Sequence, residues 1–311
     1  MTVHIVASCT ERKRASVPKD LRVRALADGP VEQRAARWLV KLASSEATPK
    51  QARDLYGGEH WKLVLELESA LRDERDRIEL SVASAGYGLV SADEPLRPYS
   101  ATFAARQPDS VVRPQDQSDA WWRVICAGRG APNCLETLVA GAEGLVVIAS
   151  AKYLRAMLPD LLRARDALPD PDHLVVFAGS DLAELGPSLI RVDARVQVAL
   201  NTRPDDRLRG SKQGLAARTA KELLCRTRTW PPTATSLAKA YHRLVADVMP
   251  PPILDRVRHE DDGVRAFIGK SLEENPRAGW TSLLRAWRSS GQACEQKRFK
   301  RLHGEVKAKR S

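Results

Sequence analysis

Between residues 84 and 99 the chain gathers several groups that could do chemistry. Glycine has no Cβ, so a ligand can approach the backbone closely. A tyrosine offers a flat face and a hydroxyl, and a carboxylate can accept a proton from water. These features suit a flat polar ligand such as a nucleobase, although a glycine-rich hairpin with two core tyrosines has the same pattern. The residues concerned are Ser84, Gly86, Tyr87, Gly88, Asp93 and Tyr99.

A second candidate group follows the first apolar run of the chain. Ser8, Cys9 and Thr10 are small and polar, and a basic loop comes directly after them. A cysteine thiolate is a strong nucleophile, and small polar residues beside cations are typical of a pocket for a phosphate or a base. The alternative is a solvated loop with one buried cysteine. We expect Ser8, Thr10 and Lys13 to contact substrate, and Arg12 and Arg14 to contact DNA.

Buried strands must position these groups. Short, continuously apolar runs bounded by small polar residues are typical of parallel strands, and helical spacing separates them here. The sequence therefore predicts an α/β fold with a mostly parallel central sheet flanked by helices, and ligands at the carboxyl ends of the strands. Ser180 follows such a run and is a further candidate for substrate contact. The expected strands are 3–7, 78–83, 145–149 and 174–178, and the alternating pattern of 190–200 predicts a half-exposed strand.

The net charge of +11 is concentrated in two segments. Residues 191–228 hold ten Lys and Arg against four Asp and Glu, and residues 291–311 hold seven against two. Such basic zones favour a polyanion partner. In the first zone, Gly210 and Ser211 precede a helix, so Lys212 and Arg218 could hold a phosphate at its N-terminus.

The last part of the chain changes character. Helical spacing predicts helices at 263–274, 280–289 and 292–306, with Gly291 as a tight turn. This pattern is similar to a helix-turn-helix with a basic final helix, although a basic tail packed on the core is the alternative. We therefore expect an α/β domain over 1–255 with a nucleobase pocket, and a small basic helical DNA-binding region over 256–311. Its expected DNA contacts are Lys297, Arg298, Lys300 and Arg301.

Several chemistries find no support in the sequence. The five cysteines are scattered without a CxxC pair, and the six histidines form no HxH or HxxxH pattern. We expect no metal and no cofactor. No apolar run approaches the length of a membrane span, and the unpaired cysteines fit a reducing cytoplasm.

The stretch from Ser84 to Phe103 resembles the signature loop of the YaaA-like superfamily, which is known from a peroxide-stress DNA-binding protein. The similarity covers about two thirds of the chain. The glycine stands at 86 rather than directly after the serine, and Ser100-Ala101-Thr102 replaces the usual tail. The matching residues are Ser84, Tyr87, Gly88, Asp93, Pro98 and Tyr99.

The resemblance implies a reaction. The size and the basic C-terminal region are similar to those of superfamily members in the bacterial system that places 7-deazaguanines in DNA. The implied reaction is metal-independent hydration of the nitrile of 7-cyano-7-deazaguanine in double-stranded DNA to the 7-amido base, alongside other proteins of the modification cluster. Asp93 is the first candidate for the base, Tyr87 or Tyr99 would donate or orient, and Cys9 is the rival as nucleophile. An N-glycosylase acting on a modified base and a non-catalytic DNA-binding protein are the alternatives.

Overall fold

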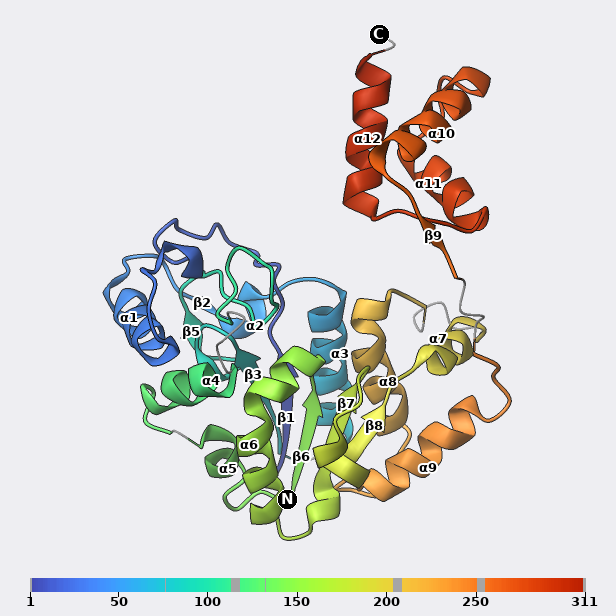
Figure 1. Ribbon diagram of the computed structural model, residues 1–311. Coiled ribbons are helices and arrows are strands. Elements are labelled where there is room, and N and C mark those ends of the chain that lie inside the picture. Colours follow the sequence, from blue (N-terminus) through green and yellow to red (C-terminus); the bar gives the residue numbers. More distant parts are fainter. Residues whose placement is uncertain are drawn as a thin grey trace. The chain divides into compact units, whose positions relative to one another are not determined.

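The centre of the computed structural model is a sheet whose order is β4-β3-β1-β6-β7-β8 (Figure 1). Neighbouring strands are parallel except β3 and β4, which form an antiparallel pair. The strands expected at 3–7, 78–83, 145–149 and 174–178 are confirmed. Their bounds are β1 Val3–Ser8, β3 Ile78–Ser84, β4 Gly88–Ser91, β6 Gly144–Ile148, β7 Leu174–Ala178 and β8 Leu189–Arg191.

The structure describes residues 2–75, 77–112, 118–131, 133–203, 209–250 and 255–309. The chain divides into two compact units, Met1–Pro250 and Pro251–Ser311, and each is described by itself. The sheet belongs to the first unit. No helix in the described ranges has the length and apolarity that crossing a membrane requires.

Helices flank the sheet because each presents one apolar face to it. Helix α3 packs against α8, while α6 packs against α4 and α5. A short antiparallel pair, β2 Lys50–Gln51 with β5 Pro95–Leu96, lies outside the main sheet. The helices are α1 Val31–Ser44, α2 Ala52–Leu55, α3 Glu59–Glu74, α4 Ser118–Ala127, α5 Cys134–Leu138, α6 Ala151–Ala167, α7 Ala194–Asn201, α8 Leu215–Leu224 and α9 Ala234–Val245.

The strand expected over 190–200 is wrong beyond its first residues. Strand β8 ends at Arg191, and helix α7 begins at Ala194. Asp193 causes the change, because its side chain accepts a hydrogen bond from the backbone N–H of Arg195 and so caps the helix. The alternation of Val192, Val196 and Val198 is therefore shared between a strand end and a helix face.

The second unit consists of three helices and a short parallel strand pair, β9 Val257–Arg258 with β10 Gln292–Ala293. The helices are α10 Asp261–Glu274, α11 Trp280–Ser289 and α12 Gln296–Ala308. This unit has its own apolar core, in which Ile268, Phe299 and Leu302 are fully buried. Three helices were expected here, and their positions agree within a few residues.

Candidate functional site

The carboxyl ends of β1 and β3 meet at Cys9. Its backbone N–H donates to the carbonyl of Ala83 at 2.9 Å, which continues the pairing of the two strands. The Cys9 Sγ lies 3.0 Å from the hydroxyl of Tyr153, which stands near the start of α6. The hydroxyl of Tyr99 lies 3.6 Å from the same sulfur. We call Cys9, Tyr56, Ser84, Tyr99 and Tyr153 the Cys9 cluster.

Hydrogen bonds within this cluster orient the hydroxyl groups toward Cys9. The Ser84 Oγ accepts the backbone N–H groups of Gly86 and Tyr87 at 3.2 and 3.0 Å. Its own proton is then free to point to the Tyr99 hydroxyl, 2.6 Å away. Tyr99 can in turn donate to the Cys9 sulfur or to the Tyr56 hydroxyl at 2.9 Å. Ser84 therefore orients the phenol that faces Cys9.

Two tryptophans hold the loop that follows Ser84. The indole N–H of Trp121 donates to the Ala85 carbonyl at 2.7 Å, and that of Trp38 donates to the Gly86 carbonyl at 2.8 Å. A Cβ on Gly86 would lie 2.4 Å from the Tyr99 ring, so only glycine fits there. The loop is the turn of an antiparallel hairpin, which is the alternative that the sequence pattern left open. Its fixed backbone supports the Cys9 cluster.

Tyr87 belongs to the same region but does not reach Cys9. Its ring packs edge-on against Tyr99 at 5.1 Å between centroids, and its hydroxyl bonds to the backbone N–H and carbonyl of Arg97. Burial raises the pKa of Tyr87 to about 12. The contacts favour a supporting position for Tyr87 rather than direct proton transfer.

Lys13 brings a cation to the cluster. Its ammonium group lies 4.6 Å from the centroid of the Tyr99 ring and 4.9 Å from that of Tyr56, and it donates to the Thr10 carbonyl at 2.6 Å. Burial lowers the pKa of Lys13, and a negative charge on Cys9 acts in the opposite direction. Lys13 therefore lies within electrostatic reach of a thiolate at Cys9.

The phenols of the cluster are proton donors at neutral pH. Burial raises the pKa values of Tyr56, Tyr99 and Tyr153 well above the ordinary value of 10, and a negative Cys9 raises them further. Each hydroxyl therefore keeps its proton until a reacting group of comparable basicity takes it.

His60, near the start of α3, is a residue that the sequence reasoning missed. The backbone of Ser8, directly before Cys9, favours the protonated form of the His60 ring and so acts against the larger effect of burial on its pKa. Its Nε2 is buried and has no hydrogen-bond partner among the described residues. Burial lowers the pKa of His60 to about 4, so the ring is neutral at pH 7 and Nε2 is able to accept a proton. Tyr56 and Tyr153 were missed as well, because they reach Cys9 from distant parts of the chain.

Asp93 does not join the Cys9 cluster. It follows β4, its side chain is 57% exposed, and its carboxylate accepts a hydrogen bond of 2.5 Å from Arg53. This bond lowers the pKa of Asp93. The expected placement of Asp93 beside the two tyrosines is therefore wrong, and a carboxylate paired with a guanidinium is a poor proton acceptor.

The helix entrance at Gly210 and Ser211 is already filled. The carboxylate of Glu59 accepts the backbone N–H and the hydroxyl of Ser211. Arg218 is 1% exposed and donates to the Ser211 carbonyl. An internal carboxylate thus stands where a phosphate was expected, and the expected DNA contact through Arg218 is wrong. Lys212 is exposed beside it.

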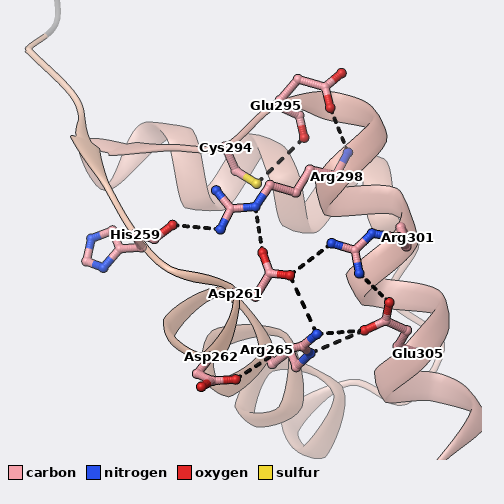
Figure 2. Close-up of polar contacts among 9 residues, drawn as sticks. All are labelled: His259, Asp261, Asp262, Arg265, Cys294, Glu295, Arg298, Arg301 and Glu305. Carbon is pink, nitrogen blue, oxygen red and sulfur yellow. Dashed lines mark hydrogen bonds and ion pairs between the residues drawn. The ribbon is translucent and has the colours of Figure 1, made fainter.

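Two arginines of α12 hold the second unit together (Figure 2). Arg298 donates to the Asp261 carboxylate at 2.6 Å and to the His259 carbonyl at 2.9 Å. Arg301 donates to the other Asp261 oxygen at 2.9 Å and also pairs with Glu305. The expectation that Arg298 and Arg301 are free to contact DNA is therefore wrong, because their guanidinium groups bind Asp261 at the start of α10.

Other cations of the second unit face solvent. Lys297 and Lys300 of α12 are exposed, and the Lys300 ammonium lies 5.7 Å from the Trp280 ring. A cavity of about 390 Å³ in the same unit has Arg256, Arg258, Arg288 and Arg298 in its wall, together with Glu295. Arg256 and Arg258 are exposed, and Arg288 donates to the Cys294 carbonyl. We give the name cationic surface of the second unit to its exposed or partly exposed cations Arg256, Arg258, Arg288, Lys297 and Lys300.

The remaining expected residues lie at the strand ends. Ser8 is buried, and Thr10 is partly exposed beside Lys13. Arg12 and Arg14 are exposed on the loop after β1, where Gly57 and Leu55 hold the backbone through hydrogen bonds. Ser180 follows β7, two strands away from β1, and no described interaction links it to the Cys9 cluster.

Comparisons with protein-family models, with curated proteins and with solved structures return no match to this chain. Within the described ranges, no group of three or more His, Cys, Asp or Glu side chains is arranged to hold a metal ion. The function is therefore argued from the Cys9 cluster and the cationic surfaces.

Proposed function

We propose that the protein hydrates the nitrile of 7-cyano-7-deazaguanine in DNA to the 7-amido base. The resemblance of Ser84–Phe103 to the YaaA-like superfamily suggests the substrate, and the size and basic C-terminal region favour its DpdC branch. The observation that carries the proposal is the position of Cys9. A nucleophile at the carboxyl end of β1, with two phenols and a cation around it, suits addition to a polar multiple bond.

The first half of the reaction forms a covalent intermediate. The Cys9 sulfur attacks the nitrile carbon while the thiol proton passes to the Tyr153 oxygen and the Tyr153 proton passes to the nitrile nitrogen, which gives a thioimidate. Tyr153, at 3.0 Å from the sulfur, is placed to supply that proton, and the Lys13 cation is placed to stabilise charge on sulfur or nitrogen. This route replaces direct activation of water by Asp93, whose carboxylate is paired with Arg53.

The second half returns the thiol. Water adds to the thioimidate carbon, and His60 Nε2 is the candidate to take one proton from that water and pass it to the nitrogen. The new hydroxyl group then gives up its proton as the carbonyl forms and the C–S bond breaks. The proton then returns to sulfur, so that the net change is the addition of one water molecule to the nitrile. A neutral histidine with a pKa of about 4 is as basic as the carboxylate that was expected in this role.

DNA binding in this proposal uses the cationic surface of the second unit and the basic loop after β1. The modified base would leave the stack to reach Cys9, as bases do in other enzymes that modify them. Thr10 and Lys13, which are partly exposed, are the candidates to line its entry.

The test is nucleoside mass spectrometry after incubating the protein with duplex DNA that carries the cyano base. Conversion to the amido nucleoside within intact DNA is expected. A free base with an abasic site would instead indicate an N-glycosylase, and unchanged DNA that is nevertheless bound would favour a non-catalytic DNA-binding protein. Intact-protein mass spectrometry during turnover should show an adduct that maps to Cys9.

A further inference from the structure

A cavity of about 600 Å³ lies in the first unit, apart from the Cys9 cluster. Its wall comes from Arg203 after α7, from the end of α8, from residues 226–229 and from α9. Leu223 and Leu237 are buried within it, while the cationic groups lie nearer to solvent. This volume is in the usual range for a small-ligand site. The cavity belongs to the basic zone 191–228 and extends it to α9.

The charges around this cavity are out of balance. Four arginines line it against one carboxylate, that of Glu222. Glu222 is 7% exposed and pairs with both Arg203 and Arg226. No ion pair engages Arg228 or Arg243 in the described part of the chain, and both are exposed. Guanidinium groups that share one cavity repel one another, and an anion between them would remove that cost.

The available donors suit phosphate. Guanidinium groups present planar forks of N–H donors that bind phosphate oxygens in pairs. Thr229 adds a hydroxyl group to the same wall, whereas the hydroxyl of Ser236 donates to the Thr233 carbonyl. Glu222 occupies Arg203 and Arg226 in part and holds them in place, which leaves Arg228 and Arg243 to receive the ligand.

We propose that this cavity is a phosphate-binding site in which Arg228 and Arg243 are the principal contacts. The phosphate belongs either to the DNA backbone, in which case the site adds a further contact of the first unit to the proposed DNA interface, or to a free phosphorylated molecule. The assignment of the phosphate to DNA rests on the proposed function, whereas the inference that the cavity binds phosphate does not.

The experiment compares the full-length protein with R228A/R243A. Titration calorimetry with inorganic pyrophosphate measures the site alone, and fluorescence anisotropy with duplex DNA measures the interface. The matched control is K41A/R123A, which removes two cations from α1 and α4, on the other side of the unit from α8 and α9 in Figure 1. Melting curves of both variants show that each is folded.

The R228A/R243A variant should bind pyrophosphate at least about tenfold more weakly, because two charged hydrogen-bonding groups are lost, and the control should bind as the unchanged protein does. If DNA binding weakens in parallel and its salt slope falls by roughly two, the phosphates are those of the backbone. If only pyrophosphate binding is lost, the site takes a free phosphorylated molecule. Equal pyrophosphate binding by both variants and the unchanged protein would overturn the proposal. Nucleoside turnover is measured in a separate experiment. The pyrophosphate result therefore tests the phosphate site even if the proposed reaction does not occur.

Discussion

At the level of single residues, Cys9 and Asp93 are the two rival candidates for the catalytic group of the proposed reaction. We expect Cys9→Ala to abolish turnover, since no thioimidate can form, and Asp93→Asn to retain activity within about threefold. If Asp93 were the base, its loss would instead cost about 10²–10⁴-fold. Rates of amido nucleoside formation on cyano-DNA decide between them, and both variants should still bind DNA. A Cys9→Ala protein that keeps a tenth of the activity would contradict the covalent route.

His60 makes the stability of the fold depend on pH. Its pKa is about 4 in the folded protein, whereas the ordinary value of 6.5 applies to the unfolded chain. Between pH 6.5 and pH 4, His60 is therefore protonated in the unfolded chain but still neutral in the folded protein. Stability from this group is therefore complete above pH 6.5 and falls by up to about 3 kcal/mol as the pH drops to 4.

The measurement is denaturant unfolding across this pH range. His60→Asn should flatten the acid side of the profile, because the difference in proton uptake between the two states disappears. The control is His242→Asn on the exposed side of α9, which should leave the slope unchanged. An identical slope in wild type and His60→Asn would show that other groups cause the acid sensitivity.

The β3–β4 hairpin is the element on which the Cys9 cluster depends, and Trp38 tests how firmly it is held. Trp38→Phe keeps most of the ring but leaves the buried Gly86 carbonyl without its donor. Such a loss costs about 1–3 kcal/mol. We expect lower stability together with slower turnover, because Gly86 packs against the Tyr99 ring.

Trp230→Phe is the matched control for this prediction. It makes the same change in size, but the Trp230 indole nitrogen has no hydrogen-bond partner among the described residues. Chemical unfolding should therefore show a smaller loss for Trp230→Phe than for Trp38→Phe. Equal losses would mean that ring packing, rather than the hydrogen bond to the hairpin, sets the cost.

The proposed DNA binding concerns the whole molecule, and the salt dependence of affinity tests it. Lys297→Ala with Lys300→Ala should weaken binding to all sequences alike and reduce the salt slope by roughly two, since both side chains are exposed and free of ion pairs in the described part of the chain. Arg298→Ala with Arg301→Ala should instead lower the melting temperature of the second unit, because Asp261 loses its two partners on α12.

Truncation completes this test. A chain that ends at Gly291 would lose Phe299 and Leu302 from the core of the second unit, so its behaviour would mix unfolding with loss of DNA contacts. A chain that ends at Pro250 removes the unit as a whole. Unchanged DNA affinity of that shorter chain would show that the second unit is not the DNA contact.

Local patterns predicted four parallel strands of the central sheet, the three helices of the second unit and the polar strand ends. A continuous apolar run such as 3–7 or 174–178 is typical of a strand that is buried on both faces of a parallel sheet, and this signal is local. The antiparallel edge strand β4 was not among the expected strands. The error in secondary structure at 190–200 had a local signal as well, because Asp193 is a common type of helix cap.

Which side chains meet depends on the packing of distant elements. Tyr153 contacts Cys9 although the two residues are 144 positions apart in the chain. Arg53 pairs with Asp93, which does not join the tyrosines. Glu59 accepts the backbone N–H of Ser211 at the entrance of the helix. Local periodicity states which face of an element is buried but not which distant residue it contacts. A charged side chain binds the opposite charge that folding brings nearest, and that neighbour depends on how the helices pack around the sheet.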